Sequence, residues 1–252
     1  MAWELIIDGA RDGATNMDID ATLLDEVDKS AETRTVVRFY GWLRPTISLG
    51  RNQKIEKAVD VEYCRANGID IVHRPTGGRA VLHDDELTYA VISNDSSAFG
   101  DTIYGNYKRV SEALCLGYNN LGVPAVLAPD TRKPEMPAMF TRGGDPPCFV
   151  SPSRYELMVG GRKIVGSAQR RVRASFLQHG SMPITCDREA LARATGLPDS
   201  TILEQEMAGV AEFLAERPSV EQLRSAFIRA FQEHFSIEFQ VISYPPVDPV
   251  IA

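Results

Sequence analysis

The stretch that decides the fold is HRPTGGRAVLHD, residues 73–84, which places two adjacent glycines between two β-rich runs. Glycine has no Cβ and tolerates positive φ, so Gly77-Gly78 lets the backbone approach a ligand and direct N–H groups at an acyl, carboxylate or phosphate oxygen. A glycine pair with charged neighbours is also an ordinary hairpin turn. A hairpin, however, does not require two arginines, a histidine and an aspartate so close together. The stretch is therefore a candidate binding loop, and the rest of the chain must decide.

The composition is that of a soluble globular protein. The chain has 252 residues, 44% hydrophobic and 24% charged, enough for one large core or two small ones. It has no run of about 18 apolar residues, and residues 1–20 lack the basic and apolar regions of a secretory leader. We therefore expect a cytoplasmic protein. The formal net charge of −7 argues against non-specific binding of nucleic acid, so an acidic partner would need a local basic patch.

Helical and strand patterns alternate along the chain without an internal repeat. We expect a first helix that begins near Asn16, whose side chain would cap it, and continues to about residue 30. The later predictions are strands over 35–40, 46–50, 69–73, 79–82, 87–93, 155–159, 163–168, 175–180 and 238–242, and helices over 59–66, 105–121 and 220–235 and from Asp187.

No change of composition marks a linker between domains. We expect a single α+β domain over residues 1–252, a mixed β-sheet with flanking helices, and a helical subregion from about residue 187 to the C-terminus. Residues 128–147 differ from the rest, with five prolines and the pair Gly143-Gly144. Loops of this length in compact domains are usually functional or disordered.

The four cysteines, Cys64, Cys115, Cys148 and Cys186, are widely spaced, with no CxxC pair and no histidine at metal-ligand spacing. Neither a disulfide framework nor a zinc site is favoured. Cys64 and Cys115 fall in predicted helices and are interpreted as small buried side chains. Cys148 follows the Pro/Gly loop, where reactive groups tend to lie, and is a candidate nucleophile. An incidental loop cysteine is the alternative.

A cysteine needs a nearby cation or base to form a thiolate at neutral pH. Lys163, within GGRKIVGSA at residues 160–168, is a candidate for that role, and a solvated lysine at a strand end is the other interpretation. His179 is a candidate pocket residue or a structural histidine. The densest basic group suits an acidic protein partner, with solvated strand ends as the alternative. Its members are Arg162, Lys163, Arg170, Arg171 and Arg173.

These motifs together resemble the lipoate-protein ligase A and octanoyltransferase superfamily over most of the chain. The likeness lies in NMDID at residues 16–20, in WLRPTISLGRNQ at 42–53, and in the opening stretch, which is similar to the family's acyl-binding loop and is followed by ELTYAV. Within the superfamily, the LipM-type octanoyltransferases are most similar. That likeness rests on Cys148-Phe149 ahead of PSRYEL, and on GRKIVGSAQ at 161–169 ahead of Gln178-His179-Gly180.

The resemblance implies a biotin/lipoate protein ligase-like catalytic domain that transfers octanoyl from octanoyl-acyl carrier protein to a lysine of a lipoyl domain, such as the glycine-cleavage H protein. By that likeness Cys148 carries the acyl group as a thioester and Lys163 lowers the pKa of its thiol. No cofactor, metal, nucleic acid or membrane is implied, and we expect a monomer. The implied substrate-binding residues are Arg74, Thr76, Gly77, Gly78, Arg79, Ala80, Val81, His83, Val165, Gly166, Ser167, Ala168, His179 and Gly180.

Three alternatives stay open. An ATP-dependent lipoate-protein ligase would use Lys163 at an acyl-adenylate and leave Cys148 incidental. Such ligases usually carry a third glycine where this chain has Arg79, and this difference favours the transferase. The chain is also short for a ligase with an accessory C-terminal domain. A lipoyl-domain amidotransferase would use the same cysteine. A non-catalytic acyl-binding protein would need neither Cys148 nor Lys163.

Overall fold

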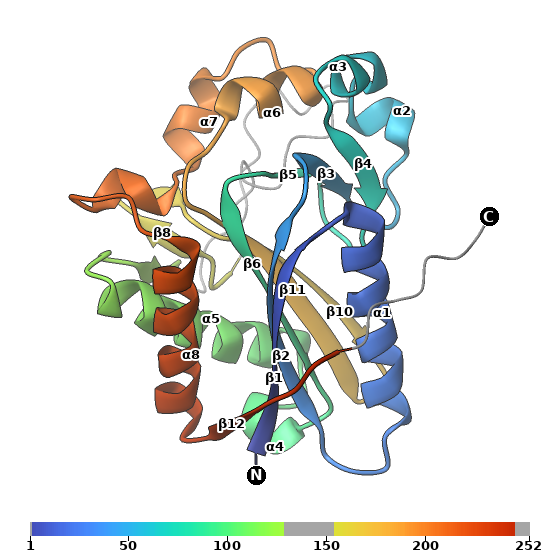
Figure 1. The fold of residues 1–252 in the computed structure, drawn as a ribbon, viewed down its shortest axis with the longest axis vertical. Helices are drawn as coiled ribbons and strands as arrows, with labels where there is room; N and C mark the ends of the chain where they lie inside the picture. Colours follow the sequence, from blue (N-terminus) through green and yellow to red (C-terminus); the bar gives the residue numbers. More distant parts are fainter. Residues whose placement is uncertain (1, 129–153, 245–252) are drawn as a thin grey trace.

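The computed structural model describes residues 2–128 and 154–244 of the chain. Its centre is a six-stranded mixed sheet in the order β10-β11-β6-β2-β1-β12 (Figure 1). The first strand, β1, pairs in parallel with β2 and β12, and the remaining neighbours are antiparallel. The strands are β1 (Ala2–Arg11), β2 (Thr35–Trp42), β6 (Glu86–Ser93), β10 (Gly166–Val172), β11 (Ser175–Pro183) and β12 (Glu238–Val241). The predicted mixed sheet and its last edge strand are thereby confirmed.

Two three-stranded sheets lie beside the large one. The first has the order β4-β3-β5 and holds the glycine loop, and the second has the order β7-β8-β9. Their strands are β3 (Thr46–Leu49), β4 (Asp70–His73), β5 (Val81–His83), β7 (Val126–Leu127), β8 (Leu157–Val159) and β9 (Arg162–Lys163). The expected single strand over 163–168 was wrong. The chain leaves one sheet after Lys163, passes through the buried Ile164 and Val165, and enters the large sheet at Gly166.

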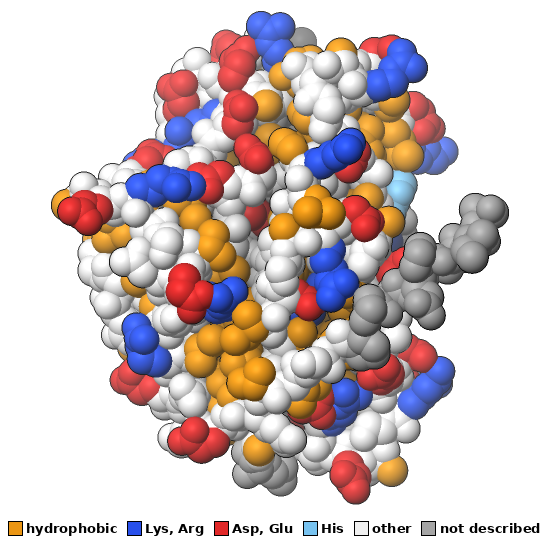
Figure 2. Space-filling model, viewed as in Figure 1, with side chains coloured by type: hydrophobic (Ala, Val, Ile, Leu, Met, Phe, Trp, Pro, Cys, Tyr) orange, Lys and Arg blue, Asp and Glu red, His pale blue; other side chains and the backbone are white. Residues whose placement is uncertain are grey.

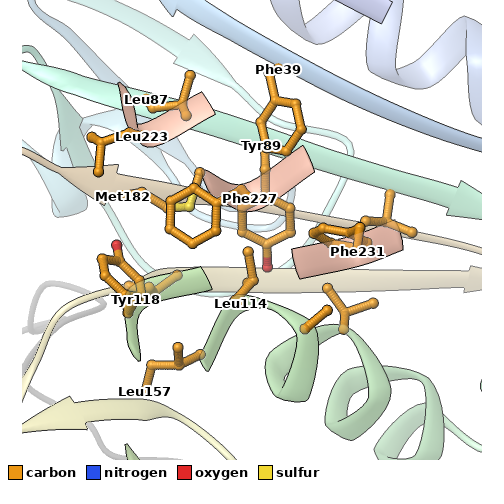
Figure 3. Close-up of a cluster of buried hydrophobic side chains, with 14 of the residues drawn as sticks. Phe39, Leu87, Tyr89, Leu114, Tyr118, Leu157, Met182, Leu223, Phe227 and Phe231 are labelled. Atoms are coloured by element: carbon orange, nitrogen blue, oxygen red, sulfur yellow. The ribbon is translucent and has the colours of Figure 1, made fainter. Parts of the chain in front are cut away.

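Helices cover both faces of the large sheet. Helix α1 (Gly13–Lys29) packs on one face, whereas α5 (Ile103–Asn120) and α8 (Val220–Phe235) pack on the other (Figure 1). In Figure 3, Leu223, Phe227 and Phe231 of α8 lie among side chains of the sheet, which include Leu87, Tyr89 and Met182. The apolar stripe predicted over 220–235 therefore forms core, although Val220 at its start is 40% exposed. The short helices are α2 (Ile55–Ala58), α3 (Val61–Ala66), α4 (Ser96–Phe99), α6 (Arg188–Ala194), α7 (Thr201–Glu206) and the 3₁₀ turn Val210–Phe213.

Helix α1 begins earlier than the sequence suggested. Its N-cap is Asp12, whose carboxylate accepts a hydrogen bond from the Thr15 N–H, so the predicted cap at Asn16 was wrong. Asn16 is buried instead. Its amide donates to the Gly41 carbonyl 2.9 Å away and its carbonyl accepts from Arg38, which ties the helix to β2. A capping residue must lie outside the first turn, and these two bonds take the Asn16 side chain away from the helix end.

The strand register places polar side chains in rows beneath α1. Arg38 of β2, Ala90 of β6 and His179 of β11 are directly paired across the three strands. Side chains alternate between the faces of a strand, so Arg38 and His179 lie on the face that α1 covers while Phe39 and Tyr89 point to the opposite core. The face beneath α1 therefore combines these polar side chains with an apolar cluster of its own, whereas the core beneath α5 and α8 is apolar.

Candidate functional site

The glycine loop, residues 74–80 between β4 and β5, is built around the side chain of its own first residue. Arg74 is buried, and its guanidinium donates to the carbonyl oxygens of Ser48, Gly77 and Arg79, each at 2.8 Å. Gly78 has a φ of +93°, and a Cβ there would lie 2.7 Å from Arg74 Nη2. The second glycine is thus required both by backbone conformation and by the close approach of the arginine. The loop is a shaped structure rather than an ordinary hairpin turn.

A cavity opens between this loop, α1 and the large sheet. The cavity is small, and most of the surface that lines it is apolar. Eight of the predicted binding residues line it: Arg74, Val81, His83, Gly166, Ser167, Ala168, His179 and Gly180. Five lining residues were not predicted: Met17, Tyr40, Trp42, Ser48 and Thr88.

Six predicted binding residues are not among those that line the cavity. Thr76 lies just behind the lining, bonded to His179, and Gly77 and Gly78 wrap around Arg74. The remaining three are Arg79, which offers its carbonyl to Arg74, and the buried residues Ala80 and Val165. Val165 belongs to the core on the α5 side of the sheet, because the chain crosses between sheets there. This placement does not support the predicted contact between the acyl group and Val165.

One wall of the cavity carries a hydroxyl, an imidazole and a carboxylate in series. Ser48 Oγ lies 2.8 Å from His83 Nε2, and His83 Nδ1 lies 2.8 Å from Glu86 Oε1. Trp42 stacks on the His83 ring at 4.1 Å between centroids and also donates to Glu86 at 3.2 Å. Glu86 accepts from Ser181 and Thr88 as well. A carboxylate with so many donors is held in one place, and it in turn fixes the orientation of His83.

A second series of the same kind stands across the cavity. Thr76 Oγ1 lies 2.8 Å from His179 Nε2, and His179 Nδ1 lies 2.7 Å from the fully buried Asp20. Asp20 also accepts from Arg38 at 2.8 Å and from Tyr40 at 2.9 Å. Burial acts to raise the pKa of Asp20, but the hydrogen bond from His179 and the Arg38 guanidinium outweigh it, so the pKa lies below its ordinary value.

His179 is held as a neutral imidazole. Burial lowers its pKa below the ordinary value of 6.5, and the charges of Arg74 and His83 act in the same direction against the attraction of Asp20. Asp20 is on the apolar face of α1, three positions from Met17 and from Leu23. A carboxylate at such a position is the sequence signal that would have identified this series.

Lys163 lies outside the cavity lining but close to it along the chain. Its ammonium is 2% exposed and lies 2.5 Å from Glu156 Oε1, the carboxylate of a residue that is itself buried. A buried lysine of this kind is held in one geometry by its carboxylate rather than solvated. The interpretation as a solvated strand-end lysine was therefore wrong. Cys148 lies outside the described residues, as do residues 129–147 of the Pro/Gly loop.

The predicted basic group is divided by the fold. Arg162 pairs with Glu212 at 2.6 Å and Lys163 with Glu156, both in the β7-β8-β9 region. The other three lie on or just after β10: Arg173 pairs with Asp28, and Arg170 and Arg171 donate to the carbonyls of Pro75 and Asp101. Figure 2 shows acidic and basic side chains intermixed on the face in view. The five residues that are close in sequence therefore lie in two regions of the fold, and their role in binding an acidic partner stays a prediction.

The remaining cysteines show no reactive environment. Cys64 is fully buried, as predicted, and Cys115 is half-buried, with burial raising the pKa of both thiols. Burial also raises the pKa of Cys186 to about 12. Within residues 2–128 and 154–244, no cluster of three or more His, Cys, Asp or Glu side chains is arranged to hold a metal ion. In the same part of the chain, no helix is both long and apolar enough to cross a membrane.

Comparison with known proteins places this site in a family. The lipoyl protein ligase A/B catalytic domain matches residues 12–232, and the chain belongs to that family. Two relatives, each named octanoyltransferase LipM, come from Moorella thermoacetica and Bacillus subtilis. The first is 38% and the second 35% identical, and in both cases the alignment covers 94% of this chain and 88% of the relative. The chain is an acyltransferase, an octanoyltransferase of lipoate biosynthesis.

The fold is also that of solved lipoate ligases. A bipartite lipoate protein ligase from Thermoplasma acidophilum, described with its E2 lipoyl domain, superimposes with a TM-score of 0.76 at 22% identity, covering 97% of this chain and 88% of that one. The predicted ligase-like α+β fold is confirmed.

Proposed function

We propose that this enzyme moves octanoyl from octanoyl-acyl carrier protein to a lysine of a lipoyl domain, such as the glycine-cleavage H protein, through a thioester on Cys148. The observation that supports this most directly is the position of Lys163. Its buried ammonium precedes Gly166 by three residues, and Gly166 lines the apolar cavity. The chain thus holds a buried cation three residues before the segment that lines the cavity.

The reaction has two steps. The Cys148 thiolate adds to the carbonyl carbon of the carrier thioester to give a tetrahedral intermediate. The intermediate collapses with cleavage of the old C–S bond, and the carrier leaves as a thiolate that takes up the proton lost from Cys148. The lysine amine of the acceptor then attacks the acyl-enzyme, loses a proton, and releases the Cys148 thiol as the amide forms. Each step exchanges an acyl group between nucleophiles, so neither needs a nucleotide.

Lys163 has the electrostatic role in this scheme. Its ammonium stabilises the attacking thiolate by charge attraction, and Glu156 holds that ammonium in place. Backbone N–H groups of the glycine loop or of residues 163–167 are suited to bind the oxyanion of the tetrahedral intermediate. Loss of one such donor typically costs roughly 3 kcal/mol of transition-state stabilisation.

Intact-protein mass spectrometry after mixing with octanoyl-acyl carrier protein, without ATP, tests the proposal. We expect an octanoyl adduct that hydroxylamine removes and that Cys148→Ala abolishes, while Cys64→Ala, the matched control at a buried cysteine, retains it. Addition of a lipoyl domain should then discharge the adduct onto the acceptor. If no adduct forms and labelling of the lipoyl domain requires ATP, the chain works as a ligase and the proposal is wrong.

A further inference from the structure

The two series on either side of the cavity are joined through one arginine. Arg74 Nε lies 3.2 Å from Thr76 Oγ1, and Arg74 Nη1 lies 3.2 Å from Ser48 Oγ. The result is a chain of hydrogen bonds that runs across the cavity from one carboxylate to the other. Its members are, in order, Asp20, His179, Thr76, Arg74, Ser48, His83 and Glu86.

The members of this chain constrain the direction of its bonds. A guanidinium has donors only, so both hydroxyl oxygens accept from Arg74. Each Nδ1 atom faces a carboxylate and carries the proton between them, and each hydroxyl proton is available for donation to the Nε2 atom beside it. In the arrangement in which both hydroxyls donate in this way, the two imidazoles have the same Nδ1–H tautomer. Protonation at either Nε2 atom would place two donors against each other and force the adjacent hydroxyl to turn.

Four elements contribute to the surroundings of His179. Asp20 approaches from α1, Arg74 from the glycine loop and His83 from β5, and Arg38 of β2 stands behind Asp20. Three of these groups carry or can carry positive charge close to the imidazole, and Asp20 alone is negative. His83 faces Glu86 of β6, and the Trp42 ring of β2 covers it.

We propose that this network is a positioning device for the glycine loop, in which Asp20 and His179 hold Thr76 while Glu86 and His83 hold Ser48, each hydroxyl donating to the Nε2 atom beside it. Thr76 directly precedes the two glycines, and Arg74 binds the carbonyls of Gly77 and Arg79. Loss of the contact between either hydroxyl and its imidazole would thus remove one support of the loop that borders the acyl site. The consequence for activity rests on the acyl transfer proposed above.

The test uses substitutions that remove single bonds without changing shape. Thr76→Val is isosteric and lacks the hydroxyl, and Thr76→Ser restores it. His179→Asn retains a donor for Asp20 at the position of Nδ1 but removes the acceptor for Thr76. Thr35→Val is the matched control, because Thr35 is also buried and its hydroxyl lies 2.7 Å from Ser93 Oγ, within β2 and β6.

We expect Thr76→Val and His179→Asn each to slow formation of the octanoyl-enzyme by about tenfold, with the double variant no slower than the slower single one. We also expect the unmodified enzyme to lose rate at acid pH, because protonation of His179 at Nε2 would break its contact with Thr76, and both variants to flatten this loss. Thr76→Ser and Thr35→Val should remain within about twofold. If the rate reductions of the two single variants multiply in the double variant, the two residues act independently and the proposal is overturned. The same holds if the loss of rate at acid pH is unchanged in the variants.

A second measurement does not depend on acyl transfer. Long-range ¹H–¹⁵N NMR spectra report the tautomer of each of the four histidines, and we expect a neutral Nδ1–H form for His179 and His83 at pH 7. An Nε2–H tautomer or a charged ring at either position contradicts the network even if the enzyme is fully active. Conversely, if both histidines show the expected tautomers but the protein forms no octanoyl adduct, only the proposed function is refuted.

Discussion

Thr76 Oγ1 and His179 Nε2 lie 2.8 Å apart although 103 positions separate the two residues in the chain. This contact joins the glycine loop to the large sheet. On the loop side, Arg74 donates to the same hydroxyl, and on the sheet side, Asp20 fixes the imidazole. The loop conformation therefore depends on the whole α1 face of the sheet and not only on its own glycines.

The two adjacent glycines of the loop should differ in their tolerance of alanine. A Cβ at Gly77 meets nothing within 4 Å, whereas Gly78 has a φ of +93° and its Cβ would lie 2.7 Å from Arg74 Nη2. We expect Gly78→Ala to lower the free energy of unfolding by at least about 1–2 kcal/mol, the usual cost of left-handed backbone in a residue with a Cβ. Gly77→Ala should remain within about 1 kcal/mol. Urea denaturation measures both, and equal losses would contradict the loop structure.

The elements that local pattern predicts best are those with strong periodicity. The strands β2, β3 and β6 and the helices α5 and α8 fall close to their expected ranges, and Gly122, with a φ of +85°, ends α5 as expected. Strand β1 was missed. Its buried residues do not alternate strictly, because both faces of the strand are covered: Leu5 packs in the core beneath α5 and α8, and Ile6 packs in the cluster beneath α1.

Only part of the cavity lining could be predicted from the sequence, because not all of its residues belong to a local motif. The glycine loop and the 166–168 segment carry recognisable motifs, but Tyr40, Trp42 and Thr88 reach the cavity through the strand order of the sheet. Pairing between strands distant in sequence is decided by tertiary packing. Asp20 had a local signal, a charge among the apolar residues of a helix face, which indicates a buried partner. Glu86 had none, because it directly follows Asp84 and Asp85.

Acid should destabilise the folded protein through His179. Its pKa in the folded state lies below the ordinary 6.5, chiefly because of burial, so below pH 6.5 the unfolded chain binds a proton that the folded protein does not. The free energy of unfolding therefore falls as the pH drops through this window, by at most about 1.4 kcal/mol per pH unit for one group. We expect His179→Asn to reduce this slope and His73→Asn, at an exposed histidine, to leave it unchanged. Urea titrations between pH 7 and pH 5 test both, and a slope that survives in His179→Asn would contradict the assignment.

The Lys163–Glu156 pair should contribute to folding as a unit. Lys163→Met leaves a buried carboxylate without its ammonium, and breaking a buried pair in this way typically costs about 3–5 kcal/mol. Removing both charges, as in Lys163→Met with Glu156→Leu, should recover much of that loss. Lys29→Met is the control, since the Lys29–Asp25 pair is well exposed and should contribute less than about 1 kcal/mol.

Measurement of acyl-enzyme formation distinguishes the role of Lys163 in stabilising the Cys148 thiolate from its role in folding. The double variant should remain unable to form an octanoyl-enzyme although it folds, because the ammonium that stabilises the thiolate is absent. Thermal unfolding and intact mass measured on the same samples report the two properties. A double variant that regains both stability and acylation would show that Lys163 has only a structural role.

The size of the cavity should set the acyl chain length. Ala168 lines the cavity on β10, opposite the glycine loop, and its Cβ lies 3.9 Å from the position of a Cβ at Gly78. Ala168→Leu adds three carbons at this narrow point. If it excludes two methylenes of a bound octanoyl chain from burial, the loss is about 1.6 kcal/mol, or more than tenfold in affinity. We expect the rate of acyl-enzyme formation to fall by that factor for octanoyl carrier and to change little for butanoyl carrier. Ala31→Leu, at an exposed position before β2, controls for the added side chain and should leave the ratio of the two rates unchanged. An equal loss for both chain lengths would mean that the acyl chain lies elsewhere.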